Sequence, residues 1–166
     1  LDLIFYLKKN STLHRIKESK IYKIYKSLHY EIPKISICFF LSEFLIKVLT
    51  SEEDQNKKFE FISKSIQDFD KIVKDYNDFH VKFLIKLSHH FGVGISNHSQ
   101  LTVYSNSDTL VTRYIENCIN DDYDIITKSN NILRNKVINL IIEYYKTNLD
   151  INFNINSNDV LNKIFK

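Results

Sequence analysis

The sequence predicts a mainly α-helical protein, in which a domain of several helices is preceded by a β-hairpin. Three observations support this fold class. A long apolar stretch with helical period spans Pro33–Thr50, further apolar faces recur every three to four residues, and two β-branched and aromatic runs flank a polar turn near the N-terminus. With 166 residues, 43% of them hydrophobic, the chain is long enough for one domain with a sizeable core.

The stretch Pro33–Thr50 (PKISICFFLSEFLIKVLT) is predicted to be the central helix. Its apolar residues leave only a narrow polar stripe of Ser36, Glu43 and Lys47, which fall close together at 100° per residue. Pro33 suits the first turn, and Glu43 and Lys47 are expected to pair on the exposed edge. A helix that is apolar around most of its circumference should be covered by other helices on several sides, and this one is too short to cross a bilayer.

The hairpin is predicted from residues 1–7 and 13–21, which are joined by a polar turn at Lys8–Ser11. A two-stranded hairpin is marginal in water, so we expect it to lean on the helices or to belong to a larger sheet. The next residues, Ile21–Tyr30, could extend the second strand or form a connector.

The remaining helices are predicted from apolar periodicity and from capping residues. They are Lys57–Val73 after an acidic link at Ser51–Asp54, a helix from a cap at Asp75 or Asn77 to Gly92, Asp108–Asn120, Asn130–Lys146 with Ser129 as its cap, and a terminal turn capped by Ser157. The Gly-, Ser- and Asn-rich segment Val93–Ser107 indicates a loop with a short extended piece at Leu101–Tyr104.

The two cysteines and the N-terminus indicate where the protein works. Cys38 and Cys118 form neither a disulfide framework nor a CxxC clamp, so we expect two buried, reduced thiols in a cytoplasmic protein. The first apolar residues follow no basic n-region and precede no small-residue cleavage site, so we do not expect them to be a signal peptide. The chain contains no Met and begins LDLIFYL, and we therefore expect it to be a fragment.

Catalytic and metal-binding motifs are not recognised in the chain. Zinc would require i,i+4 histidine pairs or CxxC arms, which do not occur among His80, His89, His90 and His98. Asp121, Asp122 and Asp124 lack the glycine and closing glutamate of a calcium loop. The chain also lacks a GxSxG elbow and a glycine-rich phosphate loop, so we expect no cofactor, no metal and no enzymatic activity.

The first 30 residues are strongly basic. They carry seven lysines and arginines against two acidic residues, whereas the rest of the chain is slightly acidic. Tyrosines at positions 6, 22 and 25 are interleaved with these cations. Cations that neutralise phosphates beside aromatic rings that stack on bases are what the binding of single-stranded nucleic acid requires. A solvated strand face with a lysine excess is an equally good interpretation of composition alone. The predicted nucleic-acid contacts are Lys8, Lys9, Arg15, Lys17 and Lys20.

Five segments, in order, resemble the RecO family of bacterial recombination mediators, and in particular its Bacteroidetes form. They are RIKE (15–18), IPKISICFFLSEFLIKVLTSEE (32–53), DFHVKFLIKLSHHFG (78–92), RNKVINLIIEYYKTNL (134–149) and SNDVLNKIF (157–165). The resemblance implies that residues 1–22 are the last strands of an N-terminal OB-fold and that residues 23–166 are the helical C-terminal domain. The four zinc cysteines of many RecO proteins are missing here.

The resemblance also implies a function. RecO proteins act in the RecF pathway of DNA repair and recombination: they bind single- and double-stranded DNA, anneal strands, and bind RecR. They also contact the acidic C-terminal tail of single-stranded-DNA-binding protein, so that RecA can be loaded. For that tail we expect a site on the helical body with basic edge residues such as Lys82, Lys86, Arg113 and Lys128.

Two other functions remain open from the sequence. The first is a helical protein–protein interaction module without DNA binding. The second is a hydrolase that uses His80 or His90, which would need a cleft around that histidine.

Overall fold

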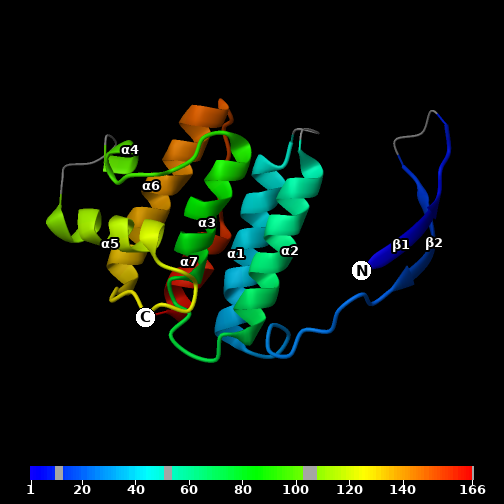
Figure 1. Ribbon diagram of the computed structural model, residues 1–166, viewed down its shortest axis with the longest axis horizontal. Helices are drawn as coiled ribbons and strands as arrows, with labels where there is room; N and C mark the ends of the chain where they lie inside the picture. Colours follow the sequence, from blue (N-terminus) through cyan, green and yellow to red (C-terminus); the bar gives the residue numbers. More distant parts are fainter. Residues whose placement is uncertain (10–12, 51–53, 103–107, 166) are drawn as a thin grey trace.

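The computed structural model describes residues 1–9, 13–50, 54–102 and 108–165. In these ranges a helical body follows an antiparallel hairpin, and the predicted mainly α fold class is confirmed (Figure 1). The strands are β1 (Asp2–Tyr6) and β2 (Arg15–Lys20). The helices are α1 (Ile32–Val48), α2 (Gln55–Lys71), α3 (Phe79–Ser88) with a 3₁₀ turn η1 (His89–Phe91), α4 (Ser99–Thr102), α5 (Thr109–Asn120), α6 (Asn131–Leu149) and α7 (Ser157–Ile164).

The most deeply buried helix is α3. Every residue of α3 except Lys86 is buried, because α2, α5 and α6 all pack against it. It continues into η1, which ends, as predicted, at Gly92, whose φ of 73° is a left-handed conformation that favours glycine. The prediction that Pro33–Thr50 forms the central helix is therefore wrong in its placement, although the helix itself is confirmed.

One side of α1 faces solvent. The helix packs against α7, but Phe39 and Ile46 are 67% and 73% exposed. The polar stripe expected on the exposed edge lies elsewhere: Ser36 is buried with its hydroxyl donating to the Ile32 carbonyl, and Glu43 is turned toward α7. The amino acid composition of this helix alone did not reveal which of its two apolar sides is covered.

Glu43 caps α7 from another helix. Its carboxylate accepts hydrogen bonds from the backbone N–H groups of Asn156 (3.0 Å) and Ser157 (2.8 Å) and from the Ser157 hydroxyl (2.5 Å). Burial opposes ionisation of Glu43, but these hydrogen bonds outweigh it and lower its pKa. Ser157 was predicted to be the cap, and it is instead the first helical residue, held by a glutamate far away in the chain.

Two other caps also differ from the prediction. The residue before α3 is Asp78, and its carboxylate accepts hydrogen bonds from the Tyr114 and Ser129 hydroxyls rather than capping the helix. Because Ser129 is committed to Asp78, Asn130 caps α6 through the Leu133 N–H at 2.8 Å.

Some predicted connections can be compared with the structure only in part. Residues 101 and 102 are helical in α4, not extended, whereas residues 103 and 104 of the same prediction lie outside the described ranges. The same holds for Asn10 and Ser11 of the predicted turn and for residues 51–53 of the acidic link.

The hairpin stands apart from the helical body (Figure 1). Every residue of both strands is exposed, so the hairpin does not lean on the helices. The other expectation, that it belongs to a larger sheet, stays a prediction. Residues 21–30 form no strand and are a connector. No helix in the described part of the chain is both long and apolar enough to cross a membrane.

Candidate nucleic-acid and peptide sites

The hairpin brings cations together through an irregularity in its pairing. Tyr6 pairs with Arg15 and Asp2 pairs with Lys20, but the register shifts between Ile4 and Phe5 and leaves Lys17 as an extra residue. Cross-strand partners share a face, and positions 2 and 6 of β1 are on the same face. Arg15 and Lys20 therefore share that face, although a regular strand would place residues five apart on opposite faces.

Lys17 belongs to the same face as Arg15 and Lys20. Its Nζ lies 5.8 Å from the centre of the Tyr6 ring, within cation–π range. The extra residue of the bulge is what brings Lys20 onto this face. We call the residues Tyr6, Arg15, Lys17 and Lys20 the hairpin cationic face.

Acidic neighbours partly neutralise one end of the hairpin cationic face. Lys20 Nζ lies 3.1 Å from Glu18 Oε1, and Asp2 is the cross-strand partner of Lys20. At the opposite end, Lys8 and Lys9 are exposed just after β1. The positive potential is therefore expected to be strongest near Tyr6 and Arg15, where no acidic residue is paired across the strands.

The connector is attached to the helical body by Asp70 of α2. The Asp70 carboxylate accepts hydrogen bonds from the N–H groups of Lys26 (2.7 Å), Ser27 (2.8 Å) and Leu28 (3.2 Å). Lys34 lies beneath, fully buried, with Nζ 2.6 Å from the Ser27 hydroxyl. Tyr25 is half-buried here, whereas Tyr22 is exposed in the connector.

The four basic residues expected to contact the partner tail do not share one surface. Lys82 is only 1% exposed, and its Nζ donates to the carbonyls of Asp122 and Ile125, both at 2.8 Å. Burial lowers the Lys82 pKa. Lys82 is thus an internal residue that holds the α5–α6 connection in place. Arg113 and Lys128 are exposed and do not line the pocket described next.

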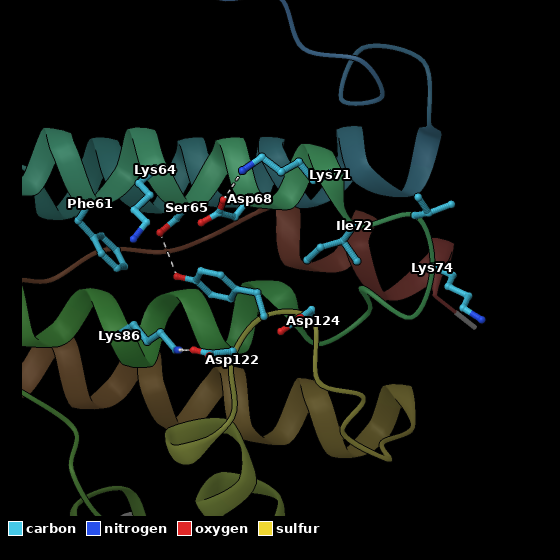
Figure 2. Close-up of a pocket in the computed structure, with 12 residues that line it drawn as sticks. Phe61, Lys64, Ser65, Asp68, Lys71, Ile72, Lys74, Lys86, Asp122 and Asp124 are labelled. Carbon is cyan, nitrogen blue, oxygen red and sulfur yellow. Dashed lines mark hydrogen bonds and ion pairs between the residues drawn. The ribbon is translucent and has the colours of Figure 1, made fainter.

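Lys86, the fourth of these residues, lines a pocket of about 800 Å³ between α2, α3 and the α5–α6 connection (Figure 2). Its Nζ is 3.1 Å from Asp122 and 5.0 Å from the centre of the Tyr123 ring. The Tyr123 hydroxyl bonds to Ser65 at 3.0 Å, and burial raises the Tyr123 pKa to about 12. The ring is therefore a fixed, neutral wall of this pocket, which we call the α2–α3 pocket.

The α2–α3 pocket combines apolar walls with lysines. Phe61 and Ile72 supply apolar surface from α2 and the residue that follows it, at opposite ends of the pocket in Figure 2. Its rim carries four lysines and three aspartates: Lys64, Lys71, Lys74, Lys86, Asp68, Asp122 and Asp124. Lys71 is paired with Asp68 at 2.8 Å, whereas Lys64 and Lys74 are exposed and have no ion pair among the described residues. An anionic ligand with an apolar end matches this combination.

The histidines do not form a site. His80 is fully buried, and burial, reinforced by the charge of Arg134, lowers its pKa to about 3. His90 packs on Phe61 with ring centres 4.5 Å apart, and His98 lies 2.9 Å from Glu116 on another part of the surface. Within the described ranges, no three His, Cys, Asp or Glu side chains are grouped as metal ligands would be. His80 is only 1% exposed and does not line the α2–α3 pocket.

The chain is similar to proteins of one family. The family described as "Recombination protein O C terminal" matches residues 29–119. A relative from Azobacteroides pseudotrichonymphae, named "DNA repair protein RecO", is 29% identical over 172 residues, covering 90% of this chain and 70% of the relative. A protein of the same name from Christiangramia forsetii is 26% identical over 99% of this chain and 76% of its own length.

A third relative, from Phocaeicola vulgatus and also named "DNA repair protein RecO", is 35% identical over 83 residues. That match spans half of this chain and only 34% of the relative. No solved structure matches the chain.

Proposed function

The chain belongs to the RecO family, and from that premise we propose that it is a non-enzymatic mediator of recombinational DNA repair. In this proposal it binds DNA, RecR and the tail of single-stranded-DNA-binding protein, and so assists strand annealing and RecA loading in the RecF pathway. Residues 1–22 would be part of an OB-fold and residues 23–166 the helical domain. The observation that carries the proposal is the hairpin cationic face, because the bulge aligns three cations beside an exposed tyrosine.

DNA binding is supported by the geometry of that face. A strand rises about 3.3 Å per residue, so Arg15 to Lys20 form a track of roughly 15 Å along which successive phosphates can be neutralised. Tyr6 is 57% exposed and offers a ring on which a base can stack. None of these groups reads base edges, so the expected binding is weak, salt-sensitive and independent of sequence.

The test is a salt titration with a labelled single-stranded oligonucleotide. We expect replacement of Lys8, Lys9, Arg15, Lys17 and Lys20 by Ala to weaken binding and to flatten the slope of log K against log[salt] by up to about 3.5 units, since each phosphate contact contributes about 0.7. The control variant replaces five exposed lysines of the helical body, Lys47, Lys57, Lys128, Lys136 and Lys163, and so changes the net charge equally. Equal affinities and slopes for wild type and the hairpin variant would place DNA binding elsewhere on the chain, whereas no detectable binding by the wild type would favour the helical interaction module without DNA binding.

The α2–α3 pocket is the site that we propose for the protein tail. Such a tail is acidic and ends in an apolar residue with a free carboxylate. Phe61, Ile72 and Tyr123 supply apolar contacts for the terminal side chain. Lys64 and Lys74 can pair with the carboxylates of the tail. The three aspartates on the rim weaken long-range attraction and orient the peptide toward the lysines.

The measurement is fluorescence anisotropy of a labelled tail peptide at low salt. We expect the double variant Lys64→Glu/Lys74→Glu to weaken binding at least tenfold, because two favourable charge contacts become repulsive. The matched control, Arg113→Glu/Lys128→Glu, reverses two exposed cations outside the pocket and should bind normally. The opposite result would move the tail to the surface around Arg113 and Lys128.

A further inference from the structure

The solvent-facing side of α1 has the pattern of a helix–helix contact. Its residues are spaced three and four apart in alternation, which is the spacing of a coiled-coil seam. They are Ile32, Ile35, Phe39, Ser42, Ile46 and Leu49, and we call them the α1 outer seam. Ile32, Phe39, Ile46 and Leu49 are 68%, 67%, 73% and 41% exposed, although all four are large and apolar. No residue of the seam is charged.

An apolar hollow lies beside the seam. A groove of about 520 Å³ between α1 and α2 is lined by Cys38, Leu41, Ser42, Leu45, Ile46, Leu49 and Ile66. It contains no charged side chain, and it makes the seam part of a wider continuous apolar surface. Contiguous apolar surfaces of this kind on a folded protein mark interaction sites.

We propose that two copies of this chain pair through the α1 outer seam as antiparallel helices, with the two-fold axis between Phe39 and Ser42. In this register Phe39 of each copy packs over Ser42 of the other, so the one aromatic residue of the seam meets its one small residue. Ile35 then meets Ile46, and Ile32 meets Leu49. The seam is thus complementary to itself, as an isologous interface must be.

Charge and area both agree with a second copy as the occupant. The carboxylate of Glu43, which flanks the seam, already accepts hydrogen bonds from backbone N–H groups at the N-terminus of α7, so its charge is compensated within one copy. An exposed apolar side chain offers on the order of 100 Å² for burial, so the seam and the groove edge supply about 500 Å² per copy and about 1,000 Å² in total. That area is at the lower limit for a specific complex and corresponds to micromolar association.

The first experiment is sedimentation equilibrium over a range of protein concentration. We expect a reversible dimer in the wild type and at least a tenfold increase in its dissociation constant in Phe39→Glu and in Ile46→Glu. Ile132→Glu is the matched control, because Ile132 is 81% exposed on α6, outside the seam. Circular dichroism verifies that all variants keep their helices. Micromolar association should be complete at a protein concentration of about 200 µM. A wild type that stays monomeric at that concentration, or a dimer that survives both seam substitutions, would overturn the proposal.

The second experiment tests the antiparallel register. Spin labels are attached singly at Lys47 and at Thr50 in a Cys38→Ala background, since both positions are exposed and lie outside the seam. At a rise of 1.5 Å per residue, labels at position 50 are about 28 Å apart along the helix axes, whereas labels at position 47 are about 20 Å apart. The label at Lys47 should therefore give the shorter distance. Equally short distances at both positions would indicate parallel helices and exclude the register proposed here.

Discussion

Asp70 shows how one side chain can position a whole segment. It binds three successive backbone N–H groups of the connector and lies next to the buried ammonium of Lys34, which also contacts the rings of Phe69 and Tyr76 at 5.6 and 5.1 Å. Burial opposes ionisation of Asp70, but the hydrogen bonds from Lys26, Ser27 and Leu28 outweigh it and lower its pKa. The folded chain therefore favours the charged carboxylate.

We expect Asp70→Asn to lower the free energy of unfolding at pH 7 by about 1–3 kcal/mol, the usual range for a hydrogen-bonded group left without its partner. Because the folded-state pKa lies below the unfolded value, this stabilisation is complete above the unfolded pKa of about 3.9 and is lost as pH falls through the folded pKa. Urea unfolding at pH 7 and at low pH measures the difference. Asp75→Asn is the control: Asp75 is exposed, and asparagine adopts its left-handed backbone equally well. A difference between wild type and Asp70→Asn that is independent of pH would contradict this account.

At the scale of helices and strands, local patterns predicted the elements better than their neighbours. Apolar periodicity identified the segments that became α1, α2, α3, α5 and α6, because each helix must bury one face whatever covers it. Caps failed where tertiary contacts compete for the same side chain. Ser129 binds Asp78 rather than its own helix, and α7 is capped by Glu43 from α1. The sequence contains no local signal for such a long-range partner.

The same reason separates the predicted residues of the candidate sites from those that were missed. The hairpin cations were identified because they are close in sequence, and a single bulge brings Lys20 onto the face of Arg15. The α2–α3 pocket joins three segments that are remote in the chain, so Phe61, Lys64 and Lys74 were not predicted. Lys82 was chosen for its charge, yet burial and two carbonyl acceptors make it structural. Basic composition does not distinguish a lysine that binds a partner from one that supports a loop.

For the whole molecule, we expect that the strands of the hairpin do not contribute to the stability of the helical body, whereas the connector does. The strands make no hydrogen bond to a helix among the described residues, whereas Lys23 bonds to Gln67 and residues 26–28 bond to Asp70.

We therefore expect that deleting residues 1–22 changes the thermal unfolding midpoint by less than about 2 °C, because less than about 1 kcal/mol is lost. Deleting residues 1–30 should lower it by about 5 °C or more, because Asp70 and the buried Lys34 then lose the partners that compensate their desolvation. Scanning calorimetry of the two deletions beside the full chain makes the comparison. If removal of residues 1–22 alone destabilised the helices as much as removal of residues 1–30, the boundary between the two parts would lie elsewhere than at residue 22.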